Sequence, residues 1–195
     1  TDDFARPANN WRYDGKDIGT YTHDSDLTYS AKVTAGDIYK DLGLSKNISA
    51  SKVSVYVNGI EDEDLAVAIS KGSDTTVANS TNGVLTQVYY DGEDETILIT
   101  RIDTYVGTVV KTVDATDKRG AYIVVNPETV NPGIGNEEFE TDKEFADDSY
   151  VLYTYSEATD EIESVELADE VNGVVTRAEN NDTNNFDKKA LTIDG

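Results

Sequence analysis

Acidic side chains gather in two short segments of the chain, and their chemistry is that of hard-cation binding. Asp91, Glu93, Asp94 and Glu95 lie within one turn-like segment, and a second acidic run covers 61–64. Calcium takes roughly six to eight oxygen ligands, and a turn of this kind supplies several. The spacing differs from that of an EF-hand loop, and a solvated turn that keeps an exposed hairpin soluble explains the same residues. The sequence therefore offers Asp91, Glu93, Asp94 and Glu95 as calcium candidates beside this simpler interpretation.

Catalytic groupings of other kinds find little support. His23 is the single histidine, and no Gly-x-Ser-x-Gly segment is present for which it could serve as the base. The absence of cysteine excludes disulfides, zinc–thiolate sites and thiol catalysis. Among 39 acidic residues, a carboxylate pair at the separation of a glycosidase is expected by chance. We therefore expect a non-enzymatic protein without a cofactor, calcium excepted, and keep a glycosidase as a remote alternative.

Aromatic residues are the second class of candidate. The chain has 12 tyrosines, four phenylalanines and one tryptophan. Rings exposed on strands can stack on sugars or pack against a neighbouring subunit, whereas half-buried rings reflect ordinary β-propensity. The candidates for ligand or interface contact are Trp11, Tyr89, Tyr105 and Tyr153.

The charge balance limits the possible partners. Asp and Glu total 39 against 16 Lys and Arg, a net charge of −23. This charge repels phosphate backbones and anionic membrane surfaces, so we expect no nucleic-acid partner. No apolar run reaches the roughly 18 residues of a membrane span, and no segment resembles a signal peptide. The first residue, Thr1, is not an initiator methionine, which indicates a processed form or a piece of a longer protein.

Period-two alternation predicts a mainly β fold. Val53–Val57 alternates and is followed by the turn dipeptide Asn58-Gly59, with Leu65–Ile69 as the predicted hairpin partner. The other predicted strands are Val84–Tyr90, Thr96–Tyr105, Val106–Val113, Ala121–Val125, Tyr150–Tyr155, Ile162–Leu167, Val174–Ala178 and Leu191–Ile193.

One short helix is predicted at about 34–43, beneath a sheet. Thr34 can cap it together with Asp37, and Gly43 can end it in the left-handed conformation. A weaker helix candidate covers 142–148. The fold class is therefore all-β or α+β with one short helix.

A pattern that begins at Tyr90 returns at Tyr155. The segment 90–97 corresponds to 155–162, and apolar residues with a glycine, Gly107 and then Gly173, follow in each copy. The offset is 65 residues at the tyrosine (155 − 90) and 66 at the glycine (173 − 107). A fixed period of this size indicates arrayed modules.

The repeat suggests three parts, built as tandem small β-barrel or β-sandwich modules. These are an N-terminal β-rich module with the helix at 1–105, a small β-barrel-like repeat module at 106–170, and the first hairpin of a further, truncated repeat at 171–195. An alternative phase starts each unit at the tyrosine strand, near Val84 and Ser149.

Two sets of residues bear on a family resemblance. Thr176–Glu179 spells the TRAE tetrapeptide of surface-layer homology domains, but polar residues follow where that domain has an apolar helix. A strand is predicted there instead, and no polymer-binding role is transferred to these residues. Three other segments resemble short stretches of the repetitive, acidic, cysteine-free ectodomains of Gram-positive gut clostridia. They are Val84–Asp91, Ile102–Gly107 and Ser149–Ser156. The resemblance covers most of the chain, from about Asp14 onwards.

The resemblance implies an extracellular structural segment of a surface-layer-type protein, which spaces or assembles on the cell envelope. Its partners would be other copies of itself, neighbouring modules of surface proteins, or cell-wall and host glycans. The absence of cysteine fits either a cytosolic protein or a secreted Gram-positive surface protein that avoids thiols, and we favour the second. An adhesin or carbohydrate-binding module that uses exposed tyrosines is the alternative.

Overall fold

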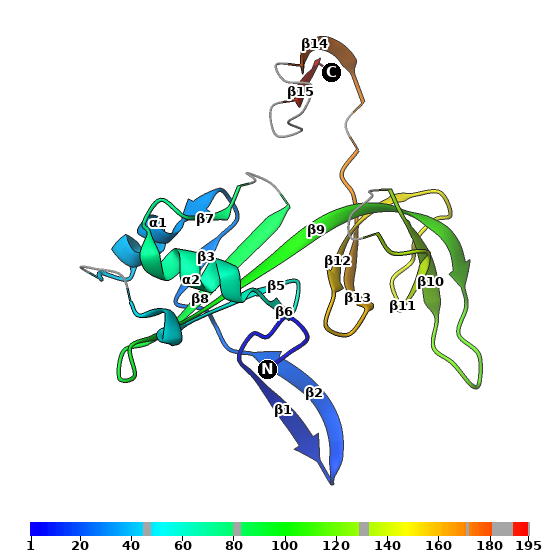
Figure 1. Cartoon of the computed structure of the whole chain (residues 1–195). Coiled ribbons are helices and arrows are strands. Elements are labelled where there is room, and N and C mark those ends of the chain that lie inside the picture. The colour runs from blue at the N-terminus through cyan, green and yellow to red at the C-terminus, as the bar shows by residue number, and fades with distance from the viewer. Residues whose placement is uncertain (45–47, 80–82, 129–132, 171, 181–188, 195) are drawn as a thin grey trace.

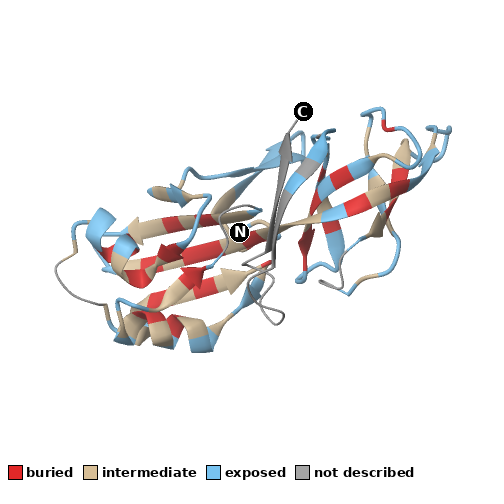
Figure 2. Ribbon diagram, turned by 90° about the horizontal axis from the view of Figure 1, so that it is seen from above, coloured by how far each residue is buried: buried red, intermediate tan, exposed pale blue. Residues whose placement is uncertain are grey.

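The long strand β9 joins two lobes. The computed structural model describes residues 1–44, 48–79, 83–128, 133–170, 172–180 and 189–194. β9 (Thr96–Val113) runs without interruption through both lobes (Figure 1). Ile97 and Ile99 near its start belong to one hydrophobic core, and Val109 near its end belongs to a second. Figure 2 shows buried residues in both lobes. The two strands predicted at Thr96–Tyr105 and Val106–Val113 are thus one strand. Its first half packs in the core of one lobe and its second half in the core of the other.

The N-terminal lobe places two helices on one face of a sheet with the strand order β6–β5–β9–β8–β3 (Figure 1). β5 is parallel to β9, and the other pairs are antiparallel. Helix and strand residues share the core, for example Ile38 and Ile69 with Val55 and Val88. The elements are β3 (Leu27–Tyr29), β4 (Val33–Thr34), α1 (Ala35–Asp41), η1 (Ala50–Lys52), β5 (Val53–Val57), β6 (Ile60–Glu61), α2 (Glu63–Lys71), β7 (Thr76–Ala78) and β8 (Val84–Asp91).

Helix α1 confirms the predicted caps. The Thr34 hydroxyl accepts a hydrogen bond from the backbone N–H of Asp37 at 3.3 Å, and the Asp37 carboxylate accepts from the N–H of Thr34 at 2.9 Å. The Thr34 hydroxyl, which donates to the Asp37 carboxylate at 2.7 Å, and then the N–H of Thr34 lower the pKa of Asp37. Gly43 follows the helix with a φ of +71°.

Helix α2 corrects two predictions, that of a single helix and that of a strand at Leu65–Ile69. Asp62 caps this helix by accepting the N–H of Leu65 at 2.9 Å, and Glu63 and Asp64 favour the positive end of its dipole. The hairpin partner of β5 is instead β6, across the two-residue turn Asn58-Gly59.

The C-terminal lobe is a curled sheet with the antiparallel order β11–β10–β9–β12–β13. The edge strands β11 and β13 approach each other, but in the described residues they share no ladder, so the predicted barrel-like module is open and the broader mainly-β class is confirmed. The candidate 142–148 is not helical; Phe145 from this segment packs into the core. The elements are β10 (Tyr122–Pro127), β11 (Glu137–Glu140), β12 (Tyr150–Ser156) and β13 (Glu161–Leu167).

The two similar segments found in the sequence form hairpins with the same kind of turn. Residues 92–95 connect β8 to β9, and 157–160 connect β12 to β13. The last turn residue has a positive φ in both, +52° at Glu95 and +63° at Asp160.

A further hairpin lies at each end of the chain and stands apart from the lobes (Figure 1). β1 (Ala8–Tyr13) pairs with β2 (Lys16–Thr22), and β14 (Val174–Asn180) pairs with β15 (Lys189–Asp194). The TRAE tetrapeptide lies in β14, so the strand predicted for it is confirmed.

Candidate functional site

A polar junction between the lobes is centred on Asn58, which is only 2% exposed. Asn58 is the first residue of the β5–β6 turn and has a φ of +49°, a conformation that asparagine tolerates better than most residues. Its backbone N–H donates to the carbonyl of Arg101 in β9 at 2.8 Å, and its carbonyl accepts from the N–H of Glu157 at 2.8 Å. One residue thus connects β5, β9 and the β12–β13 turn.

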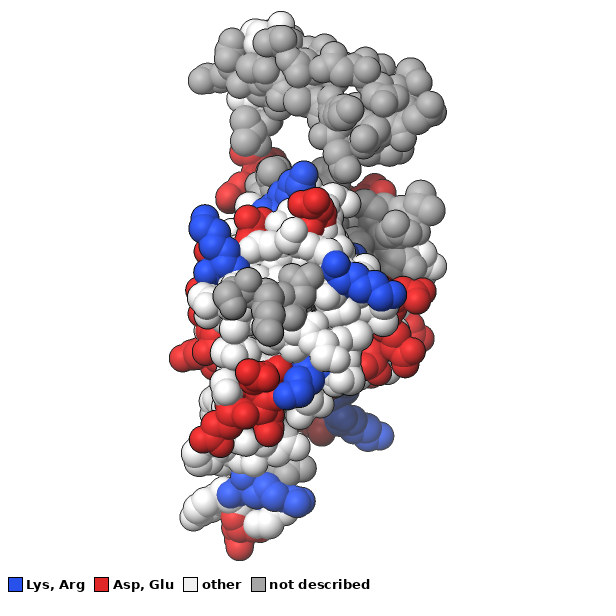
Figure 3. Space-filling view, turned by 60° about the vertical axis from the view of Figure 1, so that its left-hand side comes forward, with Lys and Arg blue, Asp and Glu red and all other residues white. Residues whose placement is uncertain are grey.

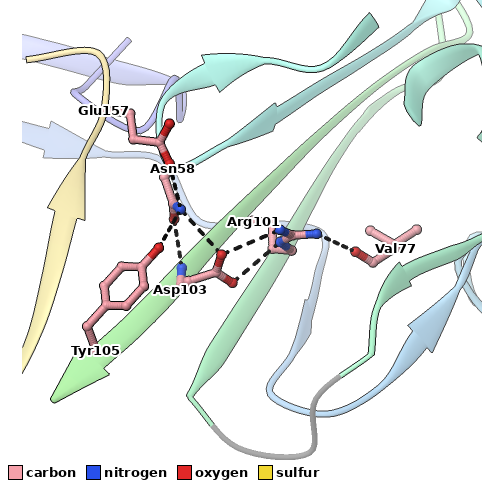
Figure 4. Close-up of polar contacts among 6 residues, drawn as sticks. All are labelled: Asn58, Val77, Arg101, Asp103, Tyr105 and Glu157. Carbon is pink, nitrogen blue, oxygen red and sulfur yellow. Dashed lines mark hydrogen bonds and ion pairs between the residues drawn. The ribbon is translucent and has the colours of Figure 1, made fainter. Parts of the chain in front are cut away.

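The side chain of Asn58 makes further hydrogen bonds to the same strand and turn (Figure 4). Its Oδ1 accepts the backbone N–H of Asp103 at 2.9 Å. Its Nδ2 lies 3.0 Å from the hydroxyl of Tyr105 and 3.3 Å from a carboxylate oxygen of both Asp103 and Glu157. Because the amide is buried, these bonds satisfy groups that would otherwise lose water without replacement.

Arg101 balances part of the negative charge at the junction. Its Nε lies 3.4 Å from Oδ1 of Asp103, and its guanidinium also donates to the carbonyl of Val77 at 3.2 Å (Figure 4). The ion pair is partly buried, so solvent screens it less than it would a surface pair. Arg101 therefore extends the junction to β7.

The N-terminal segment closes the junction from the other side. The hydroxyl of Ser156 donates to the carbonyl of Asp3 at 2.6 Å. A Cβ on Gly59 would clash with this carbonyl oxygen, and Gly59 has a φ of +89°, so glycine is required here. The junction thus joins five segments that are distant in sequence: the N-terminal segment, the β5–β6 turn, β7, β9 and the β12–β13 turn.

The junction disfavours the ionised form of Tyr105 and so raises its pKa. Burial, together with the negative charge of Asp103, raises the pKa of Tyr105 to about 12. An unfolded tyrosine titrates near pH ~10. Between these values the folded state binds more protons than the unfolded state, so the free energy of unfolding falls as the pH rises.

Replacement of Tyr105 by phenylalanine is expected to weaken this alkaline dependence. Urea unfolding followed by circular dichroism, from about pH 9 to about pH 12, should show a shallower loss of stability for Tyr105→Phe than for the wild type. Tyr122→Phe, a change at a tyrosine of the C-terminal lobe outside the junction, is the control. Equal slopes for Tyr105→Phe and the wild type would contradict the burial of this hydroxyl in its neutral form.

An acidic groove of about 440 Å³ lies beside the junction. It is lined by Val57, Ile60, the acidic run 61–64 and Glu157. Figure 3 shows acidic side chains spread over one face of the molecule, with Lys and Arg side chains between them. In the part of the chain that the structure describes, no group of three or more His, Cys, Asp or Glu is placed to hold a metal ion.

A second groove, of about 270 Å³, contains a carboxyl group that sequence reasoning missed. Glu163 in β13 lines it together with Asp2 and Asp3, and burial followed by the negative charge of Asp3 raises the pKa of Glu163. No sequence signal marks Glu163, because it is brought to the N-terminal segment only by the tertiary structure.

The four calcium candidates lie at the end of β8 and in the exposed β8–β9 turn, but no three of them are placed to hold one ion in this structure. The Asp91 carboxylate accepts the N–H groups of Glu93 and Asp94 at 2.8 and 3.2 Å and so closes the turn. Lys52 donates to the carbonyl of Asp94 at 2.6 Å and lies 3.8 Å from the carboxylate of Glu95. Calcium binding at this turn stays a prediction.

The four aromatic candidates are not brought together. Tyr105 and Tyr153 are in contact at the junction side of the C-terminal core, with ring centroids 5.6 Å apart, and Tyr153 is 1% exposed. Tyr89 is half-buried on β8, and burial raises its pKa. Trp11, in contrast, is 55% exposed on the β1–β2 hairpin. Of the four, Trp11 is thus the ring most accessible to a partner.

His23 follows the β1–β2 hairpin and is exposed. Its backbone N–H donates to the carbonyl of Pro7 at 2.8 Å. No described helix is long and apolar enough to cross a membrane. Comparison with protein-family models, with curated proteins and with solved structures finds no match to this chain.

Proposed function

We propose that this chain is a rigid spacer, a non-enzymatic structural segment of an extracellular surface-layer-type bacterial protein. The observation that carries the proposal is β9, which contributes Ile99 to one core and Val109 to the other. Two lobes that share a strand cannot rotate about each other without breaking its ladders. The junction at Asn58 adds a second, lateral connection.

The composition supports an exposed architectural role. A net charge of −23 keeps copies soluble, and the absence of cysteine leaves no thiol to oxidise. The resemblance to clostridial ectodomains, given above, is what points to the cell envelope. Neighbouring modules or copies of the chain would be its partners.

Rigidity can be measured as a distance distribution between spin labels in the two lobes. Asp74→Cys and Lys143→Cys introduce exposed attachment points, one in each lobe, into a chain without other cysteines. Double electron–electron resonance should give one narrow distribution of distances between the two labels. It should be as narrow as that of a pair within one lobe, Asp74→Cys with Glu93→Cys. A broad distribution for the pair between the lobes would contradict the spacer.

The location is tested separately on cells. Antibodies raised against the purified chain should label intact cells of the source organism, and external protease should remove the signal. Labelling only after lysis would contradict an extracellular position and leave the measured rigidity unaffected.

A glycan-binding or adhesive role is the second candidate. The observation that favours it is the exposed pair Trp11 and Tyr21, whose rings meet edge to face with centroids 5.9 Å apart. Binding to a glycan array that is lost in Trp11→Ser would support this role.

A further inference from the structure

The N-terminal hairpin exposes an unusual amount of apolar surface. Trp11, Tyr13, Ile18 and Tyr21 are all more than half exposed, and the hairpin stands apart from both lobes (Figure 1). An isolated two-stranded hairpin is marginally stable in water, and three or more strands or a covering layer are usually needed. The described residues of this chain supply neither.

The β1–β2 hairpin also resembles the hairpins that complete the two lobes. The sequence Tyr13-Asp14-Gly15 returns as Tyr90-Asp91-Gly92, 77 residues later (90 − 13), although the β1–β2 turn has two residues, 14–15, and the β8–β9 turn has four, 92–95. The same offset places Trp11 at the position of Val88, and the 65-residue offset from Val88 leads to Tyr153 (153 − 88). Val88 and Tyr153 are 0% and 1% exposed. Trp11 therefore corresponds in sequence to residues that are buried in the two lobes, but it is itself exposed.

The C-terminal hairpin resembles a different part of a lobe. At an offset of 66 residues, Gly173 before β14 corresponds to Gly107 in β9, Val175 to Val109 and Arg177 to Lys111. The β9–β10 ladder skips Val110 at an irregularity, and the β14–β15 ladder skips Thr176, which is the same position (110 + 66). β14–β15 thus matches the β9–β10 hairpin in the position of its irregularity relative to the glycine.

In the C-terminal lobe these two kinds of hairpin complete each other. β12 of the β12–β13 hairpin pairs with β9 of the β9–β10 hairpin, with Val151 opposite Gly107 and Tyr150 opposite Thr108. Gly107 makes room for the aromatic ring diagonal to it, because a Cβ there would lie 3.2 Å from Cε1 of Tyr153. Trp11 and Gly173 hold the positions of this ring and this glycine.

The N-terminal lobe shows the same pairing again. β3 pairs with β8, with Leu27 opposite Val88, just as Tyr105 of β9 lies opposite Tyr153 of β12. In the part of the chain that the structure describes, β1 pairs only with β2 and β14 only with β15. β1–β2, which resembles β12–β13, thus has no partner of the β9–β10 kind among the described residues. β14–β15, which resembles β9–β10, has no partner of the β12–β13 kind there.

We propose that the β1–β2 hairpin of one copy of this chain docks on the β14–β15 hairpin of another. β1 adds to β14 as an antiparallel strand, with Ala8 opposite Val174, Asn9 opposite Gly173 and Asn10 opposite Asn172. Every copy has both hairpins, and the two use different surfaces, so the contact is head-to-tail and extends into linear arrays. This inference deepens the proposed function by naming the neighbour, and it rests on that function being architectural.

Site-specific crosslinking tests the register. In the C-terminal lobe the N–H of Val109 donates to the carbonyl of Ser149 at 2.9 Å, so the adjacent pair, Thr108 with Tyr150, is a non-hydrogen-bonded pair. Cα atoms of such pairs are about 4.5 Å apart, which is within the range for a disulfide. Ala8 and Val174 hold the corresponding positions in the proposed contact.

Mixing the single variants Ala8→Cys and Val174→Cys under mild oxidation should give a disulfide-linked dimer of one copy of each. The matched control mixes Val174→Cys with Tyr13→Cys, which is exposed on the same hairpin but out of register. The double variant Ala8→Cys/Val174→Cys should form a ladder of linear oligomers on a non-reducing gel. Equal crosslinking in the control mixture, or none in either, would overturn the proposal.

Sedimentation velocity tests the contact without crosslinks. The wild type should associate as its concentration rises, and more strongly at higher salt, because copies with a charge of −23 repel each other at low ionic strength. Trp11→Ser should weaken association about tenfold or more, as expected for a central aromatic contact. Tyr150→Ser, at an exposed tyrosine of β12, should leave association unchanged.

The outcomes separate this inference from the proposed function. A wild type that stays monomeric at every concentration, or an unaltered association of Trp11→Ser, overturns the docking, whereas the spin-label distances within one copy still decide the spacer. Glycan binding that depends on Trp11, without crosslinking, assigns the aromatic face to a glycan and also overturns the docking.

Discussion

Replacement of Gly107 by alanine is expected to lower the free energy of unfolding by about 3 kcal/mol, because the added methyl group has no space. A Cβ on Gly107 would lie 2.7 Å from Cγ1 of Val125 and 2.9 Å from the carbonyl oxygen of Asn126. The Tyr153 ring lies on the same side at 3.2 Å and is itself fully buried. Neither backbone nor ring can move without disturbing the C-terminal core.

Urea unfolding followed by far-ultraviolet circular dichroism measures this effect. The control is Gly135→Ala, since a Cβ on Gly135 meets no atom within 4 Å, and its stability should change by less than about 0.5 kcal/mol. Similar stabilities for Gly107→Ala and Gly135→Ala would show that the C-terminal lobe is packed more loosely than the structure indicates.

Replacement of Asn58 by alanine is expected to cost about 3 kcal/mol and to uncouple the lobes. The variant leaves the N–H of Asp103 without its acceptor and brings Asp103 and Glu157 together without the amide between them. It also places alanine at a φ of +49°, which asparagine adopts at lower cost. These effects act on the contacts that connect β5 to β9 and to the β12–β13 turn.

Scanning calorimetry should resolve the uncoupling as two transitions in Asn58→Ala, where the wild type unfolds in one. The control is Asn136→Ala, at an exposed asparagine outside both cores. A single transition for Asn58→Ala, at the temperature of the wild type, would mean that β9 couples the lobes without help from the junction.

Local signals account for the elements that the sequence revealed. Thr34, Asp37 and Gly43 mark α1 at both ends, because caps are encoded within a few residues. The strands β5, β8, β12 and β13 follow from alternation bounded by turn residues. Helix α2 was missed because its apolar run, Leu65–Ile69, is too short to separate a helix from a strand by periodicity, although Asp62 and Gly72 mark its ends.

Most of the candidate site could not be predicted, because it depends on register between distant segments. The dipeptide Asn58-Gly59 predicts a turn, and the turn is present. That its amide is buried against Asp103 and Glu157, 45 and 99 residues away, follows only from the pairing of β5 and β12 with β9. The same dependence decides which strand tyrosines are buried, as Tyr153 is and Tyr150 is not.

The shared strand also determines how this protein would respond to tension. Where two domains merely touch, a pull is resisted by weak contacts at their interface. Here the pull passes from lobe to lobe along the covalent backbone of β9, through Thr104, Tyr105 and Val106. Separation of the lobes therefore requires that one sheet be stripped from β9, so mechanical failure begins inside a lobe and not between the two.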